Sequence, residues 1–76
     1  TGPYRAYYNA GRYSEVITLA TGLLSNRPNL EESYFWRGWA QNALGDTAAA
    51  VSDFNQALVF NENFEDARVA LEYLGQ

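Results

Sequence analysis

The sequence predicts an all-α domain of antiparallel helical hairpins that recur every 34 residues. Gly11-Arg12-Tyr13 and Gly45-Asp46-Thr47 mark two turns whose positions differ by 34 residues (45 − 11). Asn29-Leu30-Glu31 returns as Asn63-Phe64-Glu65 at the same offset. Between these turns, apolar residues recur at three- and four-residue spacing, which is the periodicity of amphipathic helices. A period of this length is typical of proteins built from stacked repeats.

Length and composition set bounds on the domain and its chemistry. The 76 residues make one domain, and an apolar fraction of 47% with 16% aromatic residues is enough for a core without disulfides. The sequence contains no cysteine, histidine or lysine. No thiolate metal site and no pair of nucleophile and base can therefore be assembled, so we expect no metal, no cofactor and no enzyme activity.

The charges argue against two classes of partner. The net charge is −4, and the five cations are arginines scattered along the chain. Nucleic-acid binding needs clustered cations, so we expect no nucleic-acid partner. Neither an apolar run of about 18 residues nor a signal-like leader occurs, so we expect no membrane span and no signal peptide. Because the chain opens on Thr1-Gly2-Pro3 rather than methionine, we expect it to belong to a longer protein, with its first residues left from cloning.

Two helices are expected in the first part of the chain. Residues 4–10 form a short helix that ends at Gly11, because glycine readily takes the left-handed conformation that follows a helix. A second helix is expected over residues 14–25, and Asn26-Arg27-Pro28 marks its end. Its apolar face consists of Val16, Ile17, Leu19, Ala20, Leu23 and Leu24.

A third helix is expected over residues 31–44. Asn29 is a suitable N-terminal cap, and Glu32 three residues later completes the reciprocal capping pattern. Gly45 ends this helix as Gly11 ends the first.

Two more helices follow after short turns. Either Asp46 or Thr47 is expected to cap a helix over residues 48–60. Asn63 with Asp66 repeats the capping pattern for a last helix over residues 64–74. Because the loops are two to five residues long, neighbouring helices are expected to pack antiparallel.

Small residues are expected where two helices approach closely. Gly38 lies seven residues before Gly45, and Ala50 lies five residues after it. An antiparallel hairpin is therefore expected to bring Gly38 and Ala50 together, where a larger side chain would overpack the interface.

These features resemble the tetratricopeptide repeat, a unit of 34 residues in two antiparallel helices. The residues that match one full unit are Tyr34, Gly38, Gly45-Asp46, Ala50, Phe54 and Ala57. Those that match most of the preceding unit are Tyr7, Gly11, Tyr13 and Pro28. The resemblance implies one α-solenoid fragment of about five helices over residues 1–76. Its parts are a partial repeat over 1–30, a full repeat over 31–64 and a capping helix over 65–76.

In this family, the first helices of successive units line a concave groove that binds peptides. The resemblance therefore implies a binding site with rigid aromatic anchors. The expected site residues are Arg5, Tyr8, Phe35, Trp36, Trp39, Asn42 and Tyr73, with further lining from Asn9, Glu32, Ala43, Asp66, Val69 and Ala70. An equally simple interpretation is that two of Phe35, Trp36 and Trp39 pack as core against neighbouring helices.

Two departures from the family pattern lead to further expectations. Arg37 stands where leucine is usual, so its stem is expected to cover the core while its guanidinium reaches solvent or a carboxylate such as Asp53. The heat-shock chaperone members of the family hold a peptide's terminal carboxylate with lysines and asparagines. This chain has no lysine, so we expect apolar and aromatic contacts to dominate binding.

Two functions of different kinds are compatible with these patterns. The first is a protein-protein interaction module, an appendage of a larger protein, that binds a peptide or protein segment in the concave groove. The alternative is an assembly element that forms a homodimer through exposed helix faces. The missing start of the first unit is expected to leave the helix face from Val16 to Leu24 uncovered. An RNA-binding helical repeat is opposed by the acidic charge.

Overall fold

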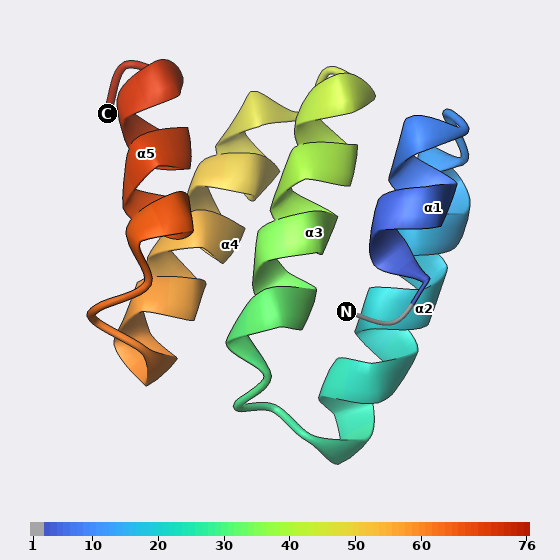
Figure 1. Ribbon diagram of the computed structural model, residues 1–76, viewed down its shortest axis with the longest axis horizontal. Helices are drawn as coiled ribbons and strands as arrows, with labels where there is room; N and C mark the ends of the chain where they lie inside the picture. Colours follow the sequence, from blue (N-terminus) through green and yellow to red (C-terminus); the bar gives the residue numbers. More distant parts are fainter. Residues whose placement is uncertain (1–2) are drawn as a thin grey trace.

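The computed structural model describes residues 3–76 as five α-helices joined by short turns (Figure 1). The helices are α1 (Tyr4–Asn9), α2 (Tyr13–Asn26), α3 (Glu31–Ala43), α4 (Thr47–Phe60) and α5 (Glu65–Tyr73). The described part of the chain contains no strand, and every expected helix lies within one residue of its expected ends. The all-α class is therefore confirmed. Thr1 and Gly2, which open the expected partial repeat, lie outside the described residues.

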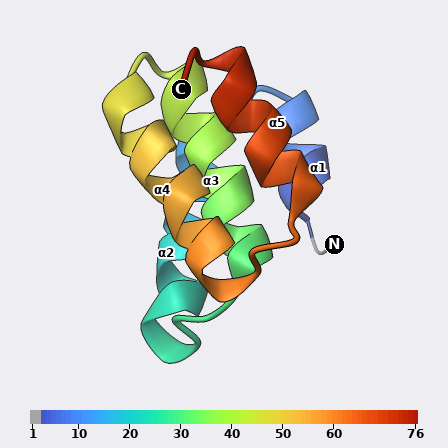
Figure 2. The ribbon, with the colours of Figure 1, turned by 90° about the vertical axis from the view of Figure 1, so that its left-hand side faces the viewer.

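The five helices are arranged in two layers (Figures 1 and 2). One layer holds α1, α3 and α5, and the other holds α2 and α4, with successive helices running in opposite directions. In Figure 2, α1 and α5 project further to one side than α3 does. The first layer is therefore curved, with α3 at its base.

The helix boundaries recur at a fixed offset. The first and last residues of α2, 13 and 26, become those of α4, 47 and 60, when 34 is added. Residue 9, the last of α1, corresponds at the same offset to residue 43, the last of α3. Residue 31, the first of α3, corresponds in the same way to residue 65, the first of α5. The helices of the first layer differ in length, because α1 has 6 residues, α3 has 13 and α5 has 9.

Glycine ends each helix of the first layer. Gly11, Gly45 and Gly75 have φ angles of 77°, 94° and 83°, a left-handed conformation that costs other residues energy. The backbone then closes with a bond that spans five residues, as from the Asp46 N–H to the Gln41 carbonyl at 2.9 Å. The expectations for Gly11 and Gly45 are confirmed.

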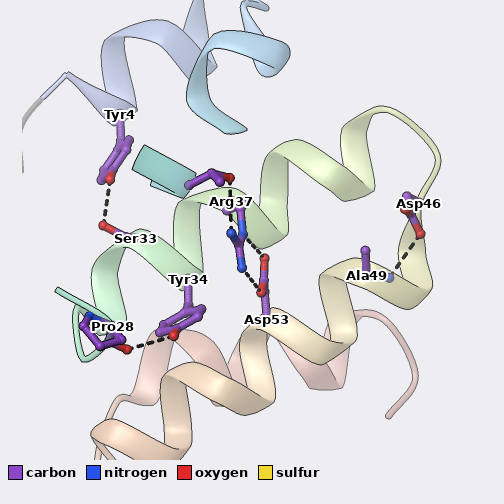
Figure 3. A network of polar contacts seen from close by, with 9 residues as sticks. Tyr4, Pro28, Ser33, Tyr34, Arg37, Asp46, Ala49 and Asp53 are labelled. Carbon is purple, nitrogen blue, oxygen red and sulfur yellow. Dashed lines mark hydrogen bonds and ion pairs between the residues drawn. The ribbon is translucent and has the colours of Figure 1, made fainter. Parts of the chain in front are cut away.

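The expected caps of α3 and α5 are wrong, whereas the expected Asp46 cap of α4 is confirmed. Asp46 accepts a hydrogen bond from the Ala49 N–H at 3.1 Å (Figure 3). The N-cap of α3 is Leu30 and that of α5 is Phe64, and neither helix has a side-chain cap. Because each helix starts one residue beyond the capping pattern, Asn29 and Asn63 lie outside the cap position.

The core consists of two clusters that meet at α3. The first joins α1, α2 and α3 through the buried residues Tyr4, Val16, Ala20 and Ala40. The second joins α4 and α5 through Ala50, Phe54, Ala70 and Leu71, with Phe35 and Trp39 of α3 packed against it. The hydroxyl groups of Tyr4 and Ser33, both buried, lie 2.7 Å apart in one hydrogen bond that ties α1 to α3 (Figure 3).

The expectation of an uncovered face on α2 is wrong for most of that face. Val16, Ala20 and Leu24 are all buried. Although α1 is short, tyrosine side chains from it, including Tyr7 and Tyr8, pack on the same cluster, and α3 adds Ala40 and Trp36. Large aromatic side chains thus cover a surface that the length of α1 alone would leave open.

A partly buried ion pair ties the two layers together. Arg37 donates from Nε to Asp53 Oδ2 at 2.7 Å and from Nη2 to Asp53 Oδ1 at 2.8 Å (Figure 3). Its Nη1 reaches Thr21 Oγ1 at 3.2 Å. The hydrogen bonds to Asp53 raise the pKa of Arg37, although burial opposes this shift. The expected approach of Arg37 to Asp53 is confirmed, and it connects α2, α3 and α4.

Helices α3 and α4 approach each other closely at Gly38, and the ring nearest to it belongs to Phe54 of α4. A Cβ atom at Gly38 would lie 2.8 to 3.1 Å from three ring carbons of Phe54. Ala50 itself is fully buried in the second cluster.

We expect Gly38→Ala to destabilise the domain by about 1–3 kcal/mol. The Phe54 ring is fully buried, so it has no room to move away from the new methyl group. Gly22→Ala is the matched control, because a Cβ there has no neighbour within 4 Å and should stabilise α2 by about 0.5–1 kcal/mol. Urea unfolding followed by circular dichroism measures both changes. Equal stabilisation by the two substitutions would contradict the close approach.

Candidate functional site

Side chains from α1, α3 and α5 line a continuous groove on the curved layer. One hollow of about 370 Å³ is lined by Arg5, Tyr8, Asn9, Phe35, Trp36, Trp39 and Asp66. A second hollow of about 270 Å³ is lined by Phe35, Trp39, Asp66, Val69, Ala70 and Tyr73. Because the two hollows share Phe35, Trp39 and Asp66, they form one surface, which we call the aromatic groove.

A chain of aromatic contacts supports the groove. In order, the rings belong to Tyr13, Tyr8, Trp36, Phe35, Phe54, Trp39 and Tyr73. Successive ring centroids lie 5.1 to 5.8 Å apart, at the tilted or edge-to-face angles that aromatic pairs prefer. Neighbouring rings hold one another in place, so a ligand would lose little free energy in ordering them.

Six of the seven expected site residues line the aromatic groove. They are Arg5, Tyr8, Phe35, Trp36, Trp39 and Tyr73. Asn42 is not among the lining residues, and its Oδ1 accepts a hydrogen bond from Thr47 Oγ1 at 3.0 Å beside the turn between α3 and α4. Of the further expected residues, Asn9, Asp66, Val69 and Ala70 line the groove, whereas Glu32 borders another hollow and Ala43 is exposed.

The aromatic residues of α3 also pack as core. Phe35 and Trp39 contact the fully buried Phe54, and Trp36 contacts Tyr8 of α1. All three side chains are half-buried and border the groove. The same three rings are therefore compatible with both the binding interpretation and the packing interpretation.

Opposite charges stand on the two sides of the groove. On α1, the Arg5 guanidinium lies 6.0 Å from the centre of the Trp36 ring, and no carboxylate pairs with it among residues 3–76. On α5, Asp66 is exposed in the first helical turn, where the helix dipole favours negative charge. A ligand that crosses the groove passes from a cation to an anion.

The pKa of Tyr8 is affected by residues of α2 and α5. Its pKa is raised above the ordinary value of 10.0, first by burial and then by the charges of Tyr13 on α2 and Tyr73 on α5. The contribution of Tyr73 reaches Tyr8 across the aromatic groove.

We expect Tyr8 to ionise above pH 10.0 and Tyr73→Phe to lower its pKa, because that substitution removes a nearby negative charge at high pH. Since folding raises this pKa, the stability that Tyr8 contributes is present below the ordinary pKa and is lost as pH rises through the folded-state value. Tyrosinate absorbance, compared with that of Tyr8→Phe, isolates this titration. A Tyr8 pKa that does not respond to Tyr73→Phe would contradict the proximity of the walls.

A third hollow borders the α2 face that was expected to be uncovered, at Leu19 and Leu23. It has a volume of about 540 Å³ and is lined by Pro3, Tyr4, Leu19, Leu23, Leu30, Glu32 and Ser33. Leu23 is 41% exposed, so the uncovered apolar surface of α2 lies here and not over Val16. We call this surface the leucine hollow.

Residues 3–76 contain no cluster of three or more carboxylate, imidazole or thiol groups placed to hold a metal ion. Within the same range, no helix has the length and apolar character that a bilayer crossing requires. No protein-family model, curated protein or solved structure matches this chain.

Proposed function

We propose that this chain is a tetratricopeptide-like repeat module that binds a segment of another protein in the aromatic groove and performs no chemistry of its own. The observation that carries the proposal is the convergence of α1, α3 and α5 on one open surface rich in ordered rings. Partly exposed aromatic side chains that are already held in place are typical binding anchors.

The repeat character rests on the 34-residue offset. The boundaries of α2 and α4 coincide at this offset, as do the ends of α1 and α3. The backbone hydrogen bonds of the turns recur at the same offset. The Arg12 N–H donates to the Tyr7 carbonyl at 2.9 Å, and the Asp46 N–H donates to the Gln41 carbonyl in the same way. We assign residues 1–30 to a partial repeat, 31–64 to a full repeat and 65–76 to a capping helix.

We expect Tyr73→Ala to weaken binding of groove ligands about tenfold. Tyr73 is 76% exposed, so its removal should leave folding intact. Val59→Ala is the matched control, because Val59 is 71% exposed and lies outside the groove. Ligands come from an unbiased displayed peptide library, and calorimetry measures their affinities. If no selected peptide is weakened by Tyr73→Ala, the proposed function is wrong.

The leucine hollow favours a second candidate, self-association through an exposed helix face. It is lined almost wholly by apolar atoms around Leu19, Leu23 and Leu30. Such a surface is stabilised when a second chain covers it.

Light scattering over a range of protein concentrations separates the two candidates. The peptide-binding proposal expects a monomer throughout. If the chain self-associates, the fraction of dimer should increase with concentration. Leu23→Ser should abolish the dimer, since a hydroxyl replaces exposed apolar surface. A dimer unchanged by Leu23→Ser would rule out the leucine hollow as its interface.

A further inference from the structure

Three side chains stand where the two hollows of the aromatic groove meet. Phe35 and Trp39 of α3 and Asp66 of α5 line both hollows, so they border one shared space. The two rings are half-buried, while Asp66 is exposed. We call these three residues the acidic junction. It places a carboxylate beside aromatic rings on an open surface.

The acidic junction has no cation of its own in the described chain. Within residues 3–76, no cation forms an ion pair with Asp66, and no arginine lies over the ring of Phe35 or Trp39. The neighbouring carboxylate differs, because Glu65 Oε1 lies 3.8 Å from Arg68 Nε. Of the two acidic residues in the first turn of α5, Asp66 is therefore the one that faces the groove.

We propose that the acidic junction binds an arginine side chain of the partner segment; this inference rests on the proposed function of the groove. The second hollow has a volume of about 270 Å³, below the about 300–1,000 Å³ of sites that enclose a whole small molecule, so it suits one long side chain. The guanidinium donates hydrogen bonds to the Asp66 carboxylate and packs its planar face on the Trp39 ring. Lysine fits less well, because its ammonium is compact, strongly hydrated and without a planar face.

The chain contains this combination once, complete within itself. Arg37 donates two hydrogen bonds to the carboxylate of Asp53, and its guanidinium carbon lies 5.6 Å from the centre of the Tyr34 ring. One guanidinium can make both contacts because its donors lie in its plane while its faces stay free to pack on a ring. The acidic junction offers a ring and a carboxylate in the same way, but without the guanidinium.

The charge distribution favours a basic partner and sets its direction. The net charge of −4 attracts cations from a distance. On the α1 side, the Arg5 guanidinium lies 6.0 Å from the centre of the Trp36 ring, so a cation already stands there and repels a second one. The ligand's arginine therefore belongs on the α5 side. A second copy of this chain is a poorer occupant, because two chains of net charge −4 repel each other.

The test selects hexapeptides from an unbiased displayed library against the wild type, Asp66→Asn and Glu65→Gln. Peptides selected by the wild type should be enriched in arginine at one position. Asp66→Asn should lose this enrichment, because it removes the charge of the acidic junction with little change in shape. Glu65→Gln is the matched control, since it removes the same charge from the same helical turn but lines neither hollow, and it should keep the enrichment. Urea unfolding checks that both variants fold.

Calorimetry on one arginine-containing peptide from this selection measures the size of the effect. Citrulline in place of the arginine keeps the shape and removes the charge, so the peptide should bind about tenfold more weakly. Lysine at the same position keeps the charge but loses the planar contact, and about threefold weaker binding is expected. With Asp66→Asn, the difference between arginine and citrulline should shrink to about threefold, because the contact with the Trp39 ring remains.

The outcomes separate the failure of this inference from that of the proposed function. If the selected peptides depend on Tyr73 but are not enriched in arginine, or if citrulline binds as tightly as arginine, the arginine site is wrong while the groove function stands. If Asp66→Asn keeps the enrichment, or Glu65→Gln loses it equally, the contact with Asp66 is refuted. If no selected peptide responds to Tyr73→Ala, both proposals fail together.

Discussion

The close approach of α3 to α4 at Gly38 is the constraint on which the rest of the molecule depends. The buried Phe54 ring occupies the space that a side chain at residue 38 would fill. From this contact, α3 reaches both core clusters, with Ala40 packed toward α2 and Trp39 packed toward α4 and α5. In so small a domain, one such contact is a large fraction of the net stability.

The same ring connects the core to the candidate binding surface. Phe54 contacts Phe35 and Trp39, and these two residues lie in both hollows of the aromatic groove. A change in how α3 and α4 pack would therefore shift the rings that a ligand meets. The ion pair of Arg37 with Asp53 acts in the same direction, because it holds α3 at a fixed position over α4. Core packing therefore determines the shape of the groove in this protein.

Helix positions were predictable because their causes are local, whereas finer contacts were not. Gly11 and Gly45 end helices through their own φ angles, and Asp46 caps α4 through an oxygen only three residues from its donor. Asn29 failed as a cap because Leu30 occupies the N-cap position of α3. Most of the groove followed from the resemblance to the tetratricopeptide repeat, but Asn42 did not, since a bond to Thr47 holds it at the turn.

The sequence by itself determined the five helices and their turns, because backbone hydrogen bonding and apolar periodicity act over a few residues. Only the tertiary structure decided that the Phe54 ring packs against Gly38 and that the tyrosines of α1 cover α2. These outcomes depend on the size and direction of side chains from helices distant in the chain, and on how they fill shared space once packed.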